Sequence, residues 1–371
     1  MNTRDDICFI DGKDYPLSIV EGMGYDNFSF MVHDFSFKSL FKYYPNTRKY
    51  VKEERKYRNY SMEALKNNTV FLQDAKFFDD CFDRAVDLEW NEFLSYRAHK
   101  YCSIFGVEDK ECTVNDSVYA LSLKFYEMRT AEECIRSISF ISDKAQRIYV
   151  ENFLRRVFIG VSADNLQWMP AIFDAIHKEY EGFQGILSKF RISCFSKSPY
   201  INRMWSSAYA NNNQGFCIEY EIDMLTESGR QLYFNILPVI YSEQRSCFFD
   251  LCETCDMVPT IEDLWQMYFN GMLRKSVDWK DQEEWRLILC DGIIEQNPVP
   301  FFKIKKVYLG NKMPLKERKK IITYCRKNNI EYVGLKRQPD SYDLVECDGD
   351  CYDCLKGGGE KLMSFNNTQQ H

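Results

Sequence analysis

The residues best suited to chemistry lie in one short segment, "SVDWKDQEEWRLIL" (276–289). Its apolar end, residues 287–289, predicts a strand that enters a core. On such a strand, alternation places Gln282, Glu284 and Arg286 on one face. Burying three polar side chains together costs free energy. The face is therefore either a solvated strand edge, the more common case, or a binding site in which one carboxylate can hold a ribose hydroxyl.

Composition and charge limit the class of protein. The chain has 371 residues, of which 45% are hydrophobic and 16% aromatic, enough for one large domain with insertions or for two domains. A net charge of -7 argues against broad nonspecific binding to nucleic acid or to an anionic membrane. Residues 303–337 are locally basic, with twelve Lys or Arg and two Glu. That segment could face a phosphate-bearing ligand or form an ordinary solvated helix surface.

The sequence favours a cytoplasmic protein. It has no apolar run of 18 residues, so no membrane-spanning helix is expected, and its acidic N-terminus does not resemble a signal peptide. The 15 cysteines are scattered without the dense spacing of a secreted disulfide scaffold, so we expect reduced thiols.

Hydrophobic periodicity predicts a strand-rich chain interrupted by helices. Strands are expected at 39–45, 69–73, 191–196, 215–222, 231–241, 284–290, 304–310 and 330–337. Amphipathic stretches between about 84 and 190 predict a large helical insertion, in which Thr130 caps one helix. Further helices are expected at 261–275 and 314–329. This order is typical of an α+β fold with a mostly antiparallel sheet.

Several familiar motifs are missing. The four histidines are far apart, which excludes a His-Glu-x-x-His zinc site, and neither a phosphate-binding loop nor a Gly-x-Ser-x-Gly elbow occurs. Cysteines near the C-terminus have the Cys-x3-Cys-x2-Cys spacing of iron–sulfur radical enzymes, but no barrel follows them. With an earlier Cys-x2-Cys pair they could form a tetrahedral zinc site, although free thiols are the more common outcome. The cysteines concerned are Cys252, Cys255, Cys347, Cys351 and Cys354.

Several segments in order together resemble one uncharacterised bacterial family, domain-of-unknown-function family 2971. They are "LFKYYP" (40–45), "ALKNNTVFLQDAKFFDDCFD" (64–83), "ISCFSKSPYINRMWSSAYANNNQGFCIEYE" (192–221), "VIY" (239–241) and "KSVDWKDQEEWRLI" (275–288). The chain departs from the family pattern twice. Asp79-Asp80-Cys81 replaces Asn-Asp-Pro, and Gln282 replaces the first glutamate of a Glu-x-Glu pair.

The strand order of that family looks like the ADP-ribosyltransferase fold. The resemblance implies a split, mostly antiparallel sheet in residues 39–345, with the helical insertion at about 84–190. An N-terminal extension (1–38) and a Cys- and Gly-rich tail (346–371) would flank this domain. Enzymes of that fold carry a His or Arg on the first strand, a Ser or Tyr in the middle and a late catalytic Glu.

Carried over by resemblance, the catalytic residues are Glu284, Gln282 and Ser196, and NAD is the substrate. Glu284 would stabilise the positive charge that develops when the nicotinamide–ribose bond breaks, and Gln282 would orient the ribose or the acceptor. Trp205 and Tyr209, four residues apart, would share a helix face and stack on a ring of the ligand. The residues expected to bind NAD are Lys42, Tyr43, Arg203, Trp205, Tyr209 and Arg286.

Each of these residues also has a plain structural interpretation. Trp205 and Tyr209 could be core aromatics, and Glu284 with Arg286 could be a structural ion pair. Lys42 stands where those enzymes have a histidine and can only donate hydrogen bonds, so dinucleotide binding could be altered or lost.

Three hypotheses about function follow. The first is an ADP-ribosyltransferase-like enzyme, such as a bacterial toxin or phage-defence effector, that acts on a protein or nucleic-acid acceptor. The second is a non-catalytic nucleotide or nucleic-acid sensor that uses the basic segment 303–337. The third is a zinc-stabilised interaction protein.

Overall fold

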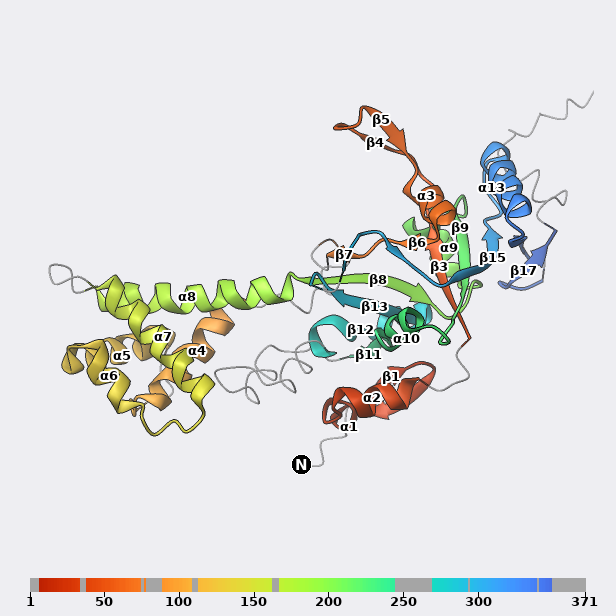
Figure 1. Cartoon of the computed structure of the whole chain (residues 1–371). Coiled ribbons are helices and arrows are strands. Elements are labelled where there is room, and N and C mark those ends of the chain that lie inside the picture. The colour runs from red at the N-terminus through yellow and green to blue at the C-terminus, as the bar shows by residue number, and fades with distance from the viewer. Residues whose placement is uncertain are drawn as a thin grey trace, which may run out of the picture.

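The computed structural model describes residues 7–33, 38–74, 77, 89–108, 113–161, 167–243, 269–292, 294–338 and 340–348 (Figure 1). Some predicted features lie outside these ranges. They are the Asp79-Asp80-Cys81 turn, most of the helix expected at 261–275, and four of the five cysteines of the hypothetical metal site.

The largest sheet formed by the described residues has nine strands, which confirms the predicted α+β class. The order is β10-β13-β8-β3-β9-β15-β16-β17, and β7 pairs with β8 off this path. All pairs are antiparallel except β15 with β16. The strands are β3 (Ser39–Tyr44), β7 (Gln73–Asp74), β8 (Phe190–Ser196), β9 (Phe216–Glu221), β10 (Ile236–Pro238), β13 (Glu284–Cys290), β15 (Lys303–Leu309), β16 (Glu331–Arg337) and β17 (Leu344–Cys347).

This sheet is split between β3 and β8. Within the described residues the two strands share a single register pair, Phe41 with Ser196. On either side the pairing is continuous, because β3 pairs with β9 along its length and β8 pairs with β13 from end to end. The expected split sheet is therefore present, and β3, β8 and β13 lie side by side at its centre.

A smaller sheet joins the N-terminal strands to two strands between residues 240 and 276, in the order β12-β11-β1-β2. The predicted N-terminal extension provides two of its strands and two helices, whose buried side chains belong to the same core as the main sheet. At the end of the second helix, His33 Nε2 lies 2.8 Å from the Ile236 carbonyl oxygen on β10. The elements are β1 (Ile7–Ile10), β2 (Lys13–Pro16), α1 (Leu17–Glu21), α2 (Tyr25–Val32), β11 (Ile240–Ser242) and β12 (Arg274–Ser276).

The helical insertion forms a separate block beside the sheets, and α8 leads directly into β8 (Figure 1). Its apolar residues form their own core. As predicted, Thr130 caps a helix: its side chain accepts a hydrogen bond from the Glu133 amide. The helices are α4 (Trp90–Ile104), α5 (Val114–Met128), α6 (Ala131–Ser137), α7 (Lys144–Gly160) and α8 (Trp168–Leu187).

Short helices and two-stranded ribbons surround the main sheet. The helices are α3 (Tyr60–Asn67), α9 (Asn202–Ser206), η2 (Ala208–Ala210), α10 (Glu227–Phe234), η3 (Phe269–Leu273), η4 (Val277–Gln282) and α13 (Leu315–Lys327). One ribbon pairs β4 (Lys49–Val51) with β5 (Lys56–Arg58), and the other pairs β6 (Thr69–Val70) with β14 (Val299–Pro300). No helix within the described ranges has the length and apolarity that crossing a membrane requires.

Two predicted strands are wrong in part. Residues 227–234 form a helix because Thr226 accepts a hydrogen bond from the Gly229 amide and starts a new turn. The segment 69–73 is not one strand. Val70 pairs with β14, and Gln73 pairs with β8. Between them, the backbone amide and carbonyl of Leu72 form hydrogen bonds with the side-chain amide of Asn297.

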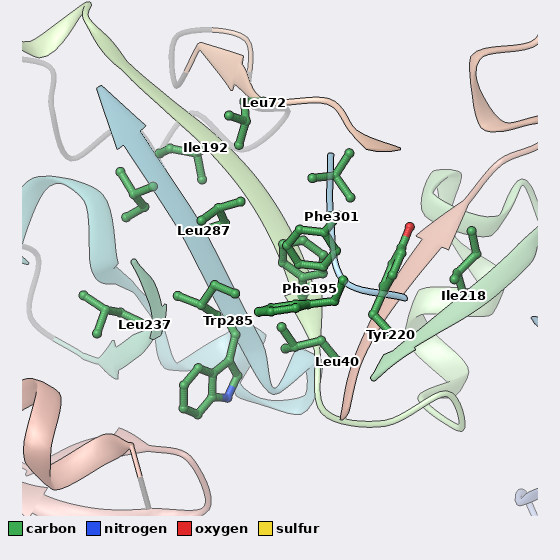
Figure 2. Close-up of a cluster of buried hydrophobic side chains, with 14 of the residues drawn as sticks. Leu40, Leu72, Ile192, Phe195, Ile218, Tyr220, Leu237, Trp285, Leu287 and Phe301 are labelled. Carbon is green, nitrogen blue, oxygen red and sulfur yellow. The ribbon is translucent and has the colours of Figure 1, made fainter. Parts of the chain in front are cut away.

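The core of the main sheet is aromatic and aliphatic (Figure 2). Phe195 stacks on Phe301 with ring centroids 4.8 Å apart, and the Tyr220 ring meets Phe301 edge-on at 4.9 Å. Trp285 and Leu287 of β13 point into this core. Glu284 and Arg286 therefore face the opposite side of the sheet, as strand alternation predicts.

Candidate functional site

A cavity of about 500 Å³ lies at the split of the main sheet. Phe41, Lys42 and Tyr43 of β3 line it on one side, and residues 192–195 of β8 on the other. Lys275, Gln282 and Glu284 line it near the start of β13. Its volume is within the usual range for small-molecule sites. The diverging strands β3 and β8 thus create the space that the predicted residues line.

Glu284 is the central charged group of the cavity. Its Oε2 lies 2.7 Å from Lys275 Nζ, and its Oε1 lies 2.7 Å from Arg286 Nε. The amide nitrogen of Glu284 donates to the Tyr241 hydroxyl at 2.9 Å. All three charged side chains are buried, so the carboxylate is held by two cations rather than by water.

The charge state of Glu284 follows from these neighbours. Burial raises the pKa of its carboxyl group, but Arg286 and Lys275 act in the opposite direction and prevail. They hold the pKa well below its usual range. Glu284 is therefore ionised at neutral pH and cannot act as a general acid. Its fixed negative charge could instead stabilise positive charge that develops on a bound sugar.

Two buried polar atoms in the cavity wall have no hydrogen-bond partner among the described residues. They are Gln282 Nε2 and Ser193 Oγ, and both side chains are 2% exposed. The other end of the Gln282 amide is engaged, because its Oε1 accepts a hydrogen bond from Lys275 at 3.0 Å. An unsatisfied buried donor costs about 1–3 kcal/mol. A ligand that offers acceptors would remove this cost at both positions.

Lys42 reaches across the split. Its Nζ donates to the Cys194 carbonyl on β8 at 2.9 Å and lies 5.0 Å from the centroid of the Phe195 ring. Burial lowers the pKa of this ammonium group. The lysine therefore has a structural role where β3 leaves β8, and it also brings a cation to the cavity wall.

Aromatic side chains form much of the remaining wall. Tyr43 is buried, and its hydroxyl donates to the Ser198 carbonyl at 2.8 Å. Burial raises the pKa of this phenol well above its usual value. Tyr209, Phe71 and Phe77 line the cavity with side chains that are 40%, 57% and 62% exposed. Exposed rings beside a cation-lined cavity suit the planar base of a nucleotide.

Four predicted site residues do not line the cavity, namely Ser196, Arg203, Trp205 and Arg286. Ser196 is buried, and its hydroxyl donates to the Gln282 carbonyl at 2.8 Å, so it positions the Gln282 loop. Arg286 lies behind Glu284 and donates to the Met272 carbonyl. Arg203 faces another group: its guanidinium carbon lies 4.0 Å from the centroid of the Trp279 ring.

The expected pairing of Trp205 with Tyr209 on one helix face is wrong. Helix α9 ends at Ser206, and Tyr209 belongs to the separate turn η2. Trp205 is buried beside Tyr43, and its indole nitrogen donates to the Pro199 carbonyl at 2.7 Å. It is a core residue, whereas Tyr209 remains at the cavity.

The prediction for Gln282 needs one structural correction. Strand β13 begins at Glu284, so Gln282 is the last residue of η4 and not part of the strand. Glu283, between them, has a left-handed backbone with φ of 45°. This turn still brings Gln282 beside Glu284, because both contact Lys275.

Sequence reasoning missed Lys275 and Ser193. Lys275 lies at the start of the segment that carries the family resemblance, but no role was assigned to it. The available signal was electrostatic, because a buried carboxylate needs cationic partners. Ser193 lies three residues before the predicted Ser196 on β8, and the residue types alone do not distinguish the two.

Among the described residues, no group of three or more His, Cys, Asp or Glu side chains could hold a metal ion. Only Cys347 of the hypothetical zinc cysteines belongs to that part of the chain, so the zinc hypothesis concerns mainly residues outside it.

Fold and cavity define an α+β protein whose mostly antiparallel sheet opens into a cavity lined by lysines, aromatic rings and one ionised glutamate. Within it, residues 204–287 match the family model described as "Protein of unknown function (DUF2971)". The match covers Tyr209, Lys275, Gln282 and Glu284 of the cavity. No curated protein and no solved structure matches the chain. The predicted family is thus confirmed for this segment, and the likeness to ADP-ribosyltransferases stays a prediction.

Proposed function

We propose that the cavity binds a dinucleotide of the NAD class and that the protein is an ADP-ribosyltransferase-like enzyme. The observation that carries this proposal is the pair of unsatisfied buried donors, Gln282 Nε2 and Ser193 Oγ, in a cavity that also contains an ionised glutamate. Ribose hydroxyls and phosphate oxygens provide the acceptors that these donors lack.

The charges of the cavity suit both ends of such a reaction. Lys42, Lys49 and Lys275 line it and would attract a pyrophosphate, while Tyr209 offers a ring face to a base. Cleavage of the nicotinamide–ribose bond leaves positive charge on the sugar. Glu284 would stabilise that charge, and the acceptor nucleophile would then bond to the same carbon.

The test is nicotinamide release from NAD, together with NAD binding measured by calorimetry. Ser193→Ala removes only a hydroxyl without a partner, so the fold is expected to tolerate it while affinity for NAD falls roughly five- to tenfold, the loss of one hydrogen bond. Ser103→Ala, at an exposed position in the helical block, is the control and should leave affinity unchanged.

The role of Glu284 needs a variant that leaves the net charge of the Glu284, Lys275 and Arg286 cluster unchanged. Glu284→Gln alone leaves Lys275 without its carboxylate, so Glu284→Gln/Lys275→Met removes both members of the pair. A folded double variant should lose release by at least about a hundredfold at saturating NAD, and its NAD affinity, measured by calorimetry, separates weaker binding through the loss of Lys275 from the loss of the reaction. Unchanged release in this variant would exclude Glu284 from the reaction.

One observation favours a second candidate, a nucleotide sensor without catalysis. Both oxygens of Glu284 already accept hydrogen bonds from cations, which reduces the negative charge available to a substrate. A sensor would bind NAD or another nucleotide, respond to Ser193→Ala, and release no nicotinamide even with cell lysate as a source of acceptor. Absence of both binding and release would contradict both candidates.

A further inference from the structure

A second hollow of the molecule lies between α3 and α13, on the side of the β4–β5 hairpin (Figure 1). It has a volume of about 780 Å³. The Tyr324 hydroxyl of α13 donates to the Lys66 carbonyl at 3.2 Å, which joins the two helices at its floor. We refer to this hollow as the basic groove.

The basic groove concentrates positive charge on a protein that is acidic as a whole. Its lining cations are Arg48, Lys66, Lys319, Lys320 and Lys327, and all five side chains are exposed. The acidic residue in the lining is Glu317, which contacts Lys320 at 2.7 Å and Arg48 at 3.6 Å. An excess of four positive charges on one face, in a chain of net charge -7, is a local feature that a polyanion can recognise.

Two of these cations, Lys320 and Lys327, follow one another along α13. Lys320 and Lys327 are seven residues apart on α13 and therefore lie on the same face, about 10 Å apart along the axis. That distance corresponds to roughly three nucleotides of a stacked strand. Tyr324, between them, also lines the groove. Repeated cations along one helix face match a repeated phosphate chain better than a single phosphate group.

Exposed tyrosines lie beside the cations. Tyr57 lines the groove and is 69% exposed, and its ring centroid lies 5.2 Å from that of Tyr50, which is 52% exposed. Both come from the β4–β5 hairpin, where they face each other in register. Such rings offer flat faces to bases that are not already stacked in a duplex.

We propose that the basic groove binds single-stranded nucleic acid, with lysines of α3 and α13 on the phosphates and Tyr57 on a base. This goes beyond the function proposed for the cavity and does not depend on it. A duplex satisfies the cations equally well but hides its base faces from the tyrosines. An anionic membrane surface would satisfy the charges and could accommodate the rings at its interface, so the comparison with phosphatidylserine vesicles distinguishes it from a single strand.

The two hollows adjoin in the sequence, since Arg48 lines the basic groove and Lys49 lines the cavity at the sheet split. A strand bound at Arg48 would therefore lie one residue along the chain from Lys49 of the cavity lining. If the cavity transfers ADP-ribose, a groove-bound strand is the candidate acceptor.

The experiment measures binding of the full-length protein to a fluorescent 15-nucleotide single strand by anisotropy, at several salt concentrations. Lys66→Ala/Lys320→Ala/Lys327→Ala should weaken binding at least tenfold. It should also reduce the slope of log affinity against log salt by about 2, because each single-strand phosphate contact contributes about 0.7. Lys144→Ala/Lys178→Ala/Lys189→Ala removes three charges elsewhere and should bind like the wild type.

Tyr57 provides a test that does not change the charge. Tyr57→Ala should weaken single-strand binding at least about fivefold, and Tyr57→Phe should retain it, because stacking needs the ring and not the hydroxyl. Equal loss in the two lysine variants, unchanged affinity in Tyr57→Ala, tighter binding of the duplex, or preference for phosphatidylserine vesicles would each overturn the proposal. Single-strand binding by the wild type, with neither NAD binding nor nicotinamide release, would reject only the function proposed for the cavity.

Discussion

Glu284 keeps its charge inside the protein because Lys275 and Arg286 are placed on either side of it. A single substitution therefore acts on the stability of the fold as well as on the cavity. Removal of the carboxylate leaves two buried cations in unfavourable contact, whereas removal of an exposed carboxylate leaves its partner in water.

We expect Glu284→Ala to lower the free energy of unfolding by about 3–5 kcal/mol, the cost of breaking a buried ion pair. Urea titration followed by tryptophan fluorescence measures this change. Glu181→Ala is the control, because its pair with Lys178 is about half exposed on both sides, and it should unfold at the same urea concentration as the wild type. A loss below about 1 kcal/mol in Glu284→Ala would show that water reaches the pair.

The residue types in segment 276–289 were sufficient to predict where the cavity lies, but not which side chains line it. Gln282 and Glu284 line it, as predicted. Ser196 and Arg286 do not line it, because they donate hydrogen bonds to the carbonyl oxygens of Gln282 and Met272, and the residue types do not reveal these partners. The identity of Lys275 as the shared partner depends on β12, whose position no local pattern indicates.

At the scale of elements, His33 fastens α2 to the main sheet. Its Nε2 lies 2.8 Å from the Ile236 carbonyl oxygen, and its Nδ1 lies 3.0 Å from the Ser29 hydroxyl. In the neutral ring Nε2–H donates to Ile236 and Nδ1 accepts from the Ser29 hydroxyl, whereas the Ser29 carbonyl oxygen, 2.9 Å from Nδ1, favours a proton on that nitrogen. Burial lowers the pKa of this imidazole, so the folded state favours the neutral form.

Stability should therefore depend on pH through His33. The folded pKa lies below the unfolded value of about 6.5, so the contribution is fully present above pH 6.5 and is lost as the pH falls below it. We expect unfolding free energy to drop between pH 7.5 and 5.5 in the wild type, and less so in His33→Gln. His177→Gln, at an exposed position, should retain the full drop. Identical pH profiles for wild type and His33→Gln would contradict this assignment.

Elements with strong local signals were predicted well, and those that depend on distant partners were not. Strand β13 and helix α13 lie within the predicted ranges because the apolar pattern of each extends over seven residues or more. The segment 69–73 failed because its two halves pair with strands more than a hundred residues away. Helix α10 was missed because a short apolar run fits either structure.

At the scale of the whole molecule, the described residues form three hydrophobic clusters, of which one belongs to the helical block alone and two to the sheets. The core of the helical block contains side chains from 93–183, and the two clusters of the sheets contain none of these. The block also holds a buried ion pair of its own, in which Arg97 Nε lies 3.5 Å from Glu179 Oε2 and Tyr101 donates to Glu179 at 2.5 Å.

We therefore expect a fragment of residues 89–188 to fold alone. Its circular dichroism should be strongly helical, and its thermal unfolding should be a single cooperative transition. Arg97→Met in this fragment should lower the melting temperature, because it strands the Glu179 carboxylate. A gradual, non-cooperative melt of the fragment would show that the block needs the sheets in order to fold.

The sheet order was not predicted, because long-range pairing leaves little trace in a single sequence. The α+β class followed from the order of local patterns, but the adjacency of β3, β8 and β13 joins paired residues that are 88 or more positions apart. That adjacency is what turns three separate polar positions into one cavity.

The alternation along β13 also has a consequence for how the chain reaches this fold. Trp285 and Leu287 enter the core while Glu284 and Arg286 face the other way. If β13 slipped by one residue against β8 during assembly, the carboxylate and the guanidinium would enter the aromatic layer. Burying two ions among Phe195 and Phe301 costs much free energy, so a β13–β8 pairing in the wrong register is unstable and separates again. The polar pair thus helps the nascent sheet to find its alignment.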